Sequence, residues 1–122
     1  MAKKILVVDD EPQIVRLLSQ RLKANGYETF AANDTYQCIK MTKEVKPDLI
    51  LLDMKMPAGG GIQAFEILKT STYSSSIPII FITAYPSDDI KNQVKELGAD
   101  GFFAKPFNSA DLLQKIEELI GK

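Results

Sequence analysis

The sequence predicts a doubly wound α/β domain, with a five-stranded parallel sheet and helices on both faces. Residues 5–8, 49–52 and 79–82 are three runs of consecutive apolar residues without alternation. Such runs are typical of strands buried on both faces, as the strands of parallel sheets are. Helix-length amphipathic segments separate the runs, and short connections of this kind favour right-handed crossovers.

Two weaker strands complete the predicted sheet. Residues 28–32 are more polar than the three apolar runs, as expected at the edge of a sheet, and residues 102–104 form a short fifth strand. Strand and helix then alternate five times along the chain. We therefore expect a single domain over residues 1–122, without an internal repeat or a second domain.

Capping residues mark the ends of several predicted helices. Val15, Leu18 and Leu22 share one face of a helix that is expected to stop at Asn25-Gly26. The other signals are N-caps with a partner three residues later (Asp34 with Gln37, Asn108 with Asp111), apolar helix faces (Ile90, Val94, Leu97; Leu112, Leu113, Ile116, Leu119, Ile120) and terminal glycines (Gly98, Gly121).

Three segments are expected to be loops. They are Pro47, the glycine run at 59–61 and the polar run at 71–76. Proline and clustered glycine or serine interrupt regular structure. None of the three is long enough to link two domains.

The composition excludes several classes of function. The chain has no histidine, which removes Ser/Cys-His nucleophile pairs, histidine bases and nearly every common zinc site. Its 15 basic and 16 acidic residues give a net charge of −1, so no basic stripe favours direct binding of nucleic acid. Any chemistry must therefore use carboxylates, hydroxyls and lysines.

The sequence also predicts a cytoplasmic protein without membrane association. Cys38 is the only cysteine and cannot form an internal disulfide. The amino-terminal segment reaches Asp9-Asp10 before a secretory apolar segment could be completed. No apolar run approaches the ~20 residues that a membrane span needs.

Four of the predicted strands end in polar or charged residues. In an open parallel sheet, ligands bind beyond the carboxyl ends of the strands, where these residues would meet. Each residue alone is equally well explained as a polar strand end in contact with water, whereas the set together points to a site. Its members are Asp9, Asp10 and Glu11 after the first strand, Asp53 after the third, Thr83 after the fourth and Lys105 after the fifth.

The three aspartates predict a site for a hard cation. Crowded carboxylates repel one another unless a cation lies among them. Ligands that are all oxygen, without thiol or imidazole, favour Mg²⁺, which keeps several waters and takes one or two carboxylates together with phosphate oxygens. Calcium fits less well, because the chain contains no Asp-x-Asp-x-Asp-Gly loop.

A carboxylate beside Mg²⁺, with a lysine and a hydroxyl nearby, is suited to accept a phosphoryl group. Asp53 is the best candidate for the acceptor. It stands alone at the end of a central strand and precedes a glycine-rich loop. Asp9 and Asp10 are adjacent and are better placed to bind the metal.

These residues resemble the receiver domain of bacterial two-component response regulators over essentially the whole chain. Four sequence blocks in the expected order and spacing are far more specific than an isolated Asp-Asp pair. The blocks are Val7-Val8-Asp9-Asp10-Glu11, Leu51-Leu52-Asp53-Met54-Lys55-Met56-Pro57, Ile82-Thr83-Ala84 and Gly98-Ala99-Asp100-Gly101-Phe102-Phe103-Ala104-Lys105-Pro106-Phe107.

The resemblance implies a flavodoxin-like sheet in the order 2-1-3-4-5 and a role for each site residue. Asp53 would be the phosphorylation site. Asp9, Asp10 and Asp53 would bind Mg²⁺ together with the backbone carbonyl of Lys55. Thr83 and Lys105 would contact the phosphoryl group, and Pro106 is a candidate for a cis peptide bond.

The resemblance also implies partners and a switch. The phosphoryl donor would be a phosphohistidine on a sensor kinase or phosphotransfer domain, and the output would be a downstream protein or an attached domain. Thr83 and Phe102 would move together and reshape the face of the fourth helix, fifth strand and fifth helix, which is also the surface for a possible homodimer. The chain would assist its own phosphorylation and dephosphorylation without being an enzyme.

Two features depart from the commonest family pattern. Gly60 stands where many members have aspartate, and Phe102 has no hydroxyl that could bond in the inward state. Lys55 and Tyr85 flank the expected site, and we hypothesise that they shield the acyl phosphate from water. Solvated surface side chains are an equally good interpretation of these two residues.

Three other functions use folds or residues of a similar kind. A haloacid-dehalogenase-like phosphatase needs Asp-x-Asp after its first strand, which Asp9-Asp10-Glu11 does not provide. A nucleotide-binding module needs Gly-x-Gly-x-x-Gly at the same place, and the glycine run follows the third strand instead. A receiver-like interaction module that is not phosphorylated stays an alternative, although Asp53, Thr83 and Lys105 are all present.

Overall fold

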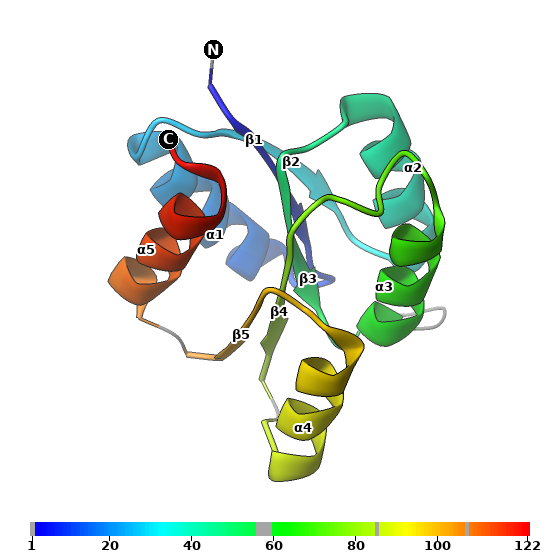
Figure 1. Cartoon of the computed structure of the whole chain (residues 1–122). Coiled ribbons are helices and arrows are strands. Elements are labelled where there is room, and N and C mark those ends of the chain that lie inside the picture. Colours follow the sequence, from blue (N-terminus) through cyan, green and yellow to red (C-terminus); the bar gives the residue numbers. More distant parts are fainter. Residues whose placement is uncertain (1, 56–59, 85, 107) are drawn as a thin grey trace.

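Five parallel strands among the described residues form one sheet in the order β2-β1-β3-β4-β5 (Figure 1). They belong to a computed structural model that describes residues 2–55, 60–84, 86–106 and 108–122. The doubly wound class and the strand order are confirmed. The strands are β1 (Lys4–Val8), β2 (Glu28–Ala32), β3 (Leu49–Asp53), β4 (Ile79–Thr83) and β5 (Gly101–Ala104), and each neighbouring pair is parallel.

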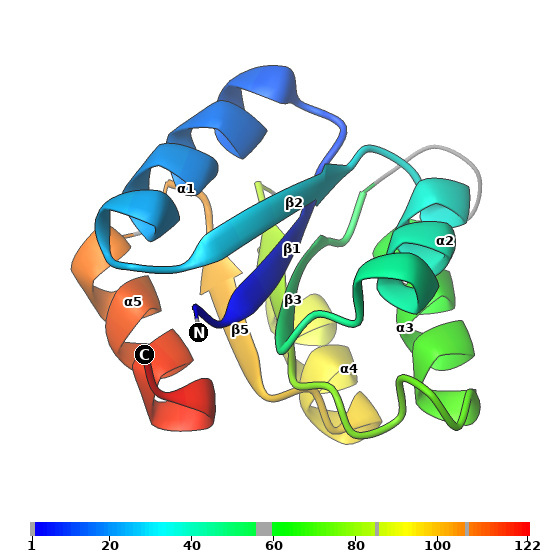
Figure 2. The ribbon, with the colours of Figure 1, turned by 90° about the horizontal axis from the view of Figure 1, so that it is seen from above.

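Helices cover both faces of the sheet, as Figures 1 and 2 show. The described residues form five of them. The helices α1 (Pro12–Ala24) and α5 (Ser109–Ile120) pack on one face. The helices α2 (Thr35–Val45), α3 (Gly60–Thr70) and α4 (Asp88–Leu97) pack on the other. Successive strand residues point to opposite faces, so both layers of helix are needed to bury the sheet.

The strand β3 illustrates why the apolar runs have no alternation. Leu49 and Leu51 belong to the core layer that includes Leu18 of α1 and Ile116 of α5. Ile50 and Leu52 belong to the opposite layer, with Phe65 of α3. Each of these four β3 residues is completely buried. The apolar pattern therefore follows from burial on both faces.

The predicted caps at two helix starts are present. The Asp34 carboxylate accepts a hydrogen bond from the backbone N–H of Gln37 at 2.7 Å. The Asn108 side chain accepts from the N–H groups of Ala110 and Asp111 at 2.8 and 3.2 Å. These bonds satisfy donors that the first turn of a helix leaves without a partner.

The glycine run after β3 is the one segment whose structure differs from the expected loop. Gly60 and Gly61 are the first residues of α3, and Gly59 lies outside the described residues. The Gly61 N–H donates to the Met54 carbonyl at 3.0 Å. A Cβ atom on Gly61 would collide with the backbone of Asp53 and Met54. Glycine therefore serves here to bring a helix close to the end of β3.

Among the helices of the described residues, no candidate for a membrane span was found, because none combines the necessary length with sufficient apolar character.

Candidate functional site

The carboxyl end of the sheet holds the polar residues that the sequence singled out. Asp9 directly follows β1, whereas Asp53 and Thr83 are the last residues of β3 and β4. Their exposed fractions are only 1%, 4% and 1%. Asp10 and Glu11 are exposed in the connection to α1. The parallel topology thus places two buried carboxylates and a buried hydroxyl together at the carboxyl end of the sheet.

Lys105 brings a positive charge to these carboxylates from the other end of the chain. Its Nζ atom lies 2.7 Å from Oδ2 of Asp9, 3.3 Å from Oε1 of Glu11 and 3.7 Å from Oδ2 of Asp53. The Lys105 backbone N–H donates to the Thr83 carbonyl at 2.7 Å, which fixes the start of the loop after β5. The peptide bond between Lys105 and Pro106 is cis.

The site holds more negative than positive charge, because one lysine lies among the carboxylates of Asp9, Asp10, Glu11 and Asp53. Burial, together with the negative charge of Asp9, raises the pKa of Asp53 to about 6, although Lys105 and the Lys55 N–H oppose the change. Burial would lower the pKa of Lys105, yet its hydrogen bond to Asp9 and the neighbouring carboxylates raise it overall. A cation bound among these groups would relieve the repulsion.

The oxygen atoms of four acidic residues lie close enough to share one cation. Carboxylate oxygens of Asp9, Asp10, Glu11 and Asp53 all fall within 4.8 Å of one another. The set contains no nitrogen or sulfur ligand, which suits a hard ion such as Mg²⁺. Lys55 is the second residue after β3, and its backbone N–H donates to Oδ1 of Asp53 at 3.2 Å.

A small cavity opens directly over Asp53. Its volume is about 270 Å³, and the residues that line it are Asp10, Glu11, Asp53, Lys55, Ala84 and Lys105. The lining combines acidic and basic side chains with one small residue. A group of phosphoryl size could reach the Asp53 carboxylate through this cavity, between the loops that follow β1, β3, β4 and β5.

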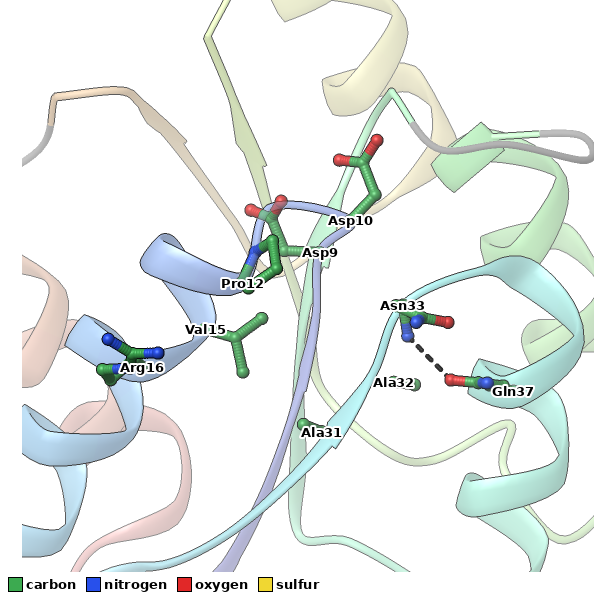
Figure 3. Close-up of a pocket in the computed structure, with 9 residues that line it drawn as sticks. All are labelled: Asp9, Asp10, Pro12, Val15, Arg16, Ala31, Ala32, Asn33 and Gln37. Carbon is green, nitrogen blue, oxygen red and sulfur yellow. Dashed lines mark hydrogen bonds between the residues drawn. The ribbon is translucent and has the colours of Figure 1, made fainter.

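A second cavity of about 310 Å³ lies beside the first, toward the edge strand β2 (Figure 3). Asp9 and Asp10 line one end of it, and Val15 and Arg16 of α1 line a side. On the β2 side, the Asn33 N–H donates to the Gln37 side chain at 3.1 Å. The two cavities share Asp10, which therefore has access to solvent on both sides.

The two predicted switch residues lie on neighbouring strands. Thr83 ends β4 and pairs in register with Ala104 of β5. Phe102 is half-buried opposite Phe81 and packs against the core layer beneath α4. It also lines a cavity of about 390 Å³ together with Pro86, Ser87, Asp88, Lys91 and Ala104.

The structure brings together Asp9, Asp10, Asp53 and Lys105, with Thr83 at the neighbouring strand end. Phe102 lies two residues before Ala104 on β5 and lines the cavity beneath α4 rather than the cavity over Asp53. Lys55 is exposed beside the site, whereas Tyr85, Met56, Pro57 and Phe107 lie outside the described residues.

The sequence does not predict the roles of two residues at the site. Glu11 belongs to the predicted set of strand-end residues without a role of its own, yet its side chain contacts Lys105. Gly61 falls in a predicted loop, yet it allows α3 to approach the backbone of Asp53. The sequence signals are the third acidic residue after β1 and the third glycine of the run at 59–61.

Comparisons with known proteins agree with this arrangement. The sequence profile of the response regulator receiver domain family matches residues 5–117. The phosphate regulon transcriptional regulatory protein PhoB of Pseudomonas aeruginosa is 38% identical over 98% of this chain and 52% of its own length. The chain thus spans about half the length of that relative.

Two other relatives match over nearly their whole length. Sporulation initiation phosphotransferase F of Bacillus subtilis is 37% identical over 98% of this chain and 95% of its own. The solved structure of chemotaxis protein CheY4 of Vibrio cholerae superimposes with a TM-score of 0.90, at 28% identity over 98% of this chain and 99% of that one. These findings favour a receiver over the phosphatase alternative, and the chain belongs to the response regulator receiver domain family.

Proposed function

We propose that the chain accepts a phosphoryl group on Asp53 and transmits the change through protein contacts. The observation that carries this proposal is the site itself. A buried carboxylate with a raised pKa faces a cavity, with a lysine ammonium 3.7 Å away and two further aspartates beside it. The receiver family membership supports the same conclusion.

The proposed chemistry is a simple displacement. An oxygen of ionised Asp53 attacks the phosphorus of a partner's phosphohistidine, and the P–N bond breaks with its electron pair staying on the imidazole nitrogen. Asp53 then carries an acyl phosphate, which water later cleaves to inorganic phosphate and free carboxylate. Lys105 and the Thr83 hydroxyl would contact the phosphoryl oxygens, where charge must be neutralised.

Asp9, Asp10, Asp53 and the Lys55 carbonyl would bind Mg²⁺. The fit rests on the donor set, since the clustered side-chain ligands are all carboxylate oxygens. When bound, Mg²⁺ supplies positive charge next to the transferred phosphoryl group. Asp9 also holds the loop, because its Oδ1 atom accepts from the Glu11 N–H at 2.9 Å. The carboxylate is therefore oriented before a metal arrives.

The output would use the switch proposed for Thr83 and Phe102. A hydroxyl drawn toward the phosphoryl group leaves space behind it, and the half-buried Phe102 ring borders the cavity beneath α4. A shift of this ring would alter the surface of α4, β5 and α5, which we propose as the contact face for a downstream protein, an attached domain or a second copy.

The remaining assignments belong to the same proposal. The donor would be a sensor kinase or a histidine phosphotransfer domain, which agrees with the absence of histidine here. Residues 1–122 would act as one receiver domain in the cytoplasm. The chain would be a phosphoacceptor that promotes its own reaction rather than an enzyme with a separate substrate.

Phosphorylation can be tested directly with a small phosphoryl donor. Incubation with Mg²⁺ and acetyl phosphate should add the mass of one phosphoryl group to the wild type and none to Asp53→Asn. The matched control is Asp48→Asn, which changes an aspartate at the opposite end of the sheet and should still be phosphorylated. Lack of mass gain in the wild type would contradict the proposal.

The shielding hypothesis has its own test. If Lys55 and Tyr85 exclude water, then Lys55→Asn and Tyr85→Ala should shorten the half-life of the phosphorylated protein. Unchanged half-lives would count against shielding without affecting the choice of Asp53.

A further inference from the structure

Glu11 directly precedes helix α1, but its side chain contacts Lys105 rather than the helix. It is the N-cap residue of α1, yet its side chain forms no capping hydrogen bond with the helix. The side chain extends instead to Lys105, whose Nζ lies 3.3 Å from Oε1. The contact joins residues 94 positions apart in the sequence, and both of them line the cavity over Asp53.

This contact bears on where the lysine ammonium lies in the resting site. Nζ is within hydrogen-bond distance of Asp9 and Glu11, which both precede α1, and is 3.7 Å from Asp53. The ammonium is thus held on the β1 side of the site. In the proposed function Lys105 has to meet phosphoryl oxygens on Asp53, so its bond to Glu11 must weaken or break.

We propose that Glu11 is a positioning residue that holds Lys105 toward the β1–α1 connection and competes with the phosphoryl group for it. This inference rests on the proposed function of Asp53. Glu11 does not touch the reacting atoms and acts through Lys105. It sets how readily the lysine becomes available, and so biases the chain toward the unphosphorylated state.

The exposure of Glu11 suits such a role. Its side chain is 57% exposed, whereas that of Lys105 is 9% exposed. An ion pair with one solvated partner is weak, so the contact can exchange without a large barrier. We expect removal of the Glu11 charge to strengthen binding of a phosphoryl mimic by about two- to fivefold.

Direct metal binding is the rival interpretation of Glu11, because its carboxylate lies in the same 4.8 Å group as the three aspartates. The two interpretations predict opposite results. A metal ligand contributes to Mg²⁺ affinity, so its loss weakens the site. A competitor for Lys105 leaves Mg²⁺ affinity nearly unchanged and tightens binding of the anionic mimic.

The test measures binding of beryllium fluoride to the Mg²⁺-loaded protein by calorimetry in a double-mutant cycle. Glu11→Gln should tighten binding when Lys105 is present and should have no effect in a Lys105→Ala background. Glu44→Gln is the matched control, since it removes one exposed negative charge on α2 and should change neither measurement. In metal-free protein, the NMR signals of the Lys105 side chain should shift with Glu11→Gln and not with Glu44→Gln.

Three results would overturn the inference. If Glu11→Gln tightened beryllium fluoride binding equally with Lys105 and with Lys105→Ala, the effect would be general charge repulsion. If Glu11→Gln lowered the Mg²⁺ affinity by about tenfold or more, Glu11 would be a metal ligand. If the Lys105 signals did not change in Glu11→Gln, the two side chains would not be coupled. Failure of the proposed function is separable, because wild-type protein would then bind no beryllium fluoride while the Lys105 signals still report the contact with Glu11.

Discussion

Aspartates at the two ends of the sheet have opposite surroundings. At the amino end, Asp48 and Asp100 directly precede β3 and β5 and bond the first residue of the neighbouring strand. Asp48 accepts from the Lys4 N–H at 2.7 Å, and its own N–H donates to the Lys4 carbonyl at 2.7 Å. Asp100 makes the same pair of bonds with Ile79, at 3.0 and 2.9 Å.

At the carboxyl end, Asp9 and Asp53 face each other and share one lysine. The pKa of Asp53 is raised by burial and by the Asp9 charge. At the amino end, an aspartate whose partner is a neutral backbone N–H adds hydrogen bonds to the end of the sheet. At the carboxyl end, the ionised form of Asp53 is disfavoured because it is buried and its neighbour is another carboxylate. The surroundings of a carboxylate, rather than its burial alone, therefore separate the aspartates that bond the backbone at the amino end from those that cluster at the carboxyl end.

Gly61→Ala, at the carboxyl end of the sheet, should cause the largest loss of folding stability. The new Cβ would collide with the backbone of Asp53 and Met54, and backbone atoms cannot move aside cheaply, so we expect a loss of stability on the order of 3 kcal/mol. Urea unfolding measures it. Gly101→Ala is the control at the amino end. There the Cβ meets the Ile80 side chain at 3.2 Å, and the change should stay within about 1 kcal/mol of the wild type. Equal losses of stability in Gly61→Ala and Gly101→Ala would show that the glycine at the carboxyl end is no more constrained than the one at the amino end.

Asp53→Asn should stabilise the metal-free protein at neutral pH. The folded-state pKa of about 6 exceeds the ordinary 3.8, so the folded chain holds the Asp53 proton more tightly than the unfolded chain does. The resulting stability is complete below the unfolded pKa and is lost as the pH rises through the folded one. The gain from Asn should therefore be on the order of 2 kcal/mol near neutral pH and should shrink as the pH falls from the folded pKa of about 6 toward the unfolded 3.8. Urea unfolding in EDTA at several pH values tests it, and a gain that does not depend on pH would contradict the stated cause.

Asp100→Ala should change stability in the opposite direction. It leaves the Ile79 N–H without its carboxylate acceptor, which should cost about 1–3 kcal/mol. Faster hydrogen exchange at the Ile79 amide would locate the effect. Asp48→Ala should behave in the same way at Lys4. If either variant were as stable as the wild type, the amino-end aspartates would not have the structural role assigned here.

The smallest expected effect lies in the turn between α2 and β3. Lys46 is the C-cap of α2 and has φ of +56°, a left-handed conformation that glycine adopts at less cost. Lys46→Gly should raise stability by about 0.5 kcal/mol. Lys43→Gly, within the last turn of the same helix, should lower it by up to about 1 kcal/mol. Thermal unfolding of the pair provides the comparison, and a loss in both variants would refute it.

The site could be predicted largely because it depends on topology. Parallel strands place Asp9, Asp53 and Thr83 at the carboxyl end of the sheet whatever the details of side-chain packing. Apolar runs are enough to define those strands. The strand order itself came from family resemblance, since periodicity does not specify which strands are neighbours. Gly61 was misassigned because a glycine run resembles a loop when the backbone it must approach is unknown.

The contact of Glu11 with Lys105 could not be predicted for a related reason. The role of Glu11 depends on where β5 ends, and no local pattern connects it to a lysine 94 residues later. The buried aspartates could be found because strand ends converge. The direction of an exposed side chain depends on three-dimensional placement, which sequence periodicity does not contain.

The contact between Lys105 and Asp9 has a consequence for how the protein forms during synthesis. The two residues are 96 positions apart, and β1 lies inside the sheet while β5 lies at its edge. A growing chain that has reached β4 can already bring Asp9 and Asp53 together, but it lacks the ammonium that partly neutralises them. Docking of β5 therefore completes the charge balance, and contacts this distant in sequence are slow to form. The arrangement of charges at the carboxyl end of the sheet is thus expected to form late in folding, when β5 pairs with β4.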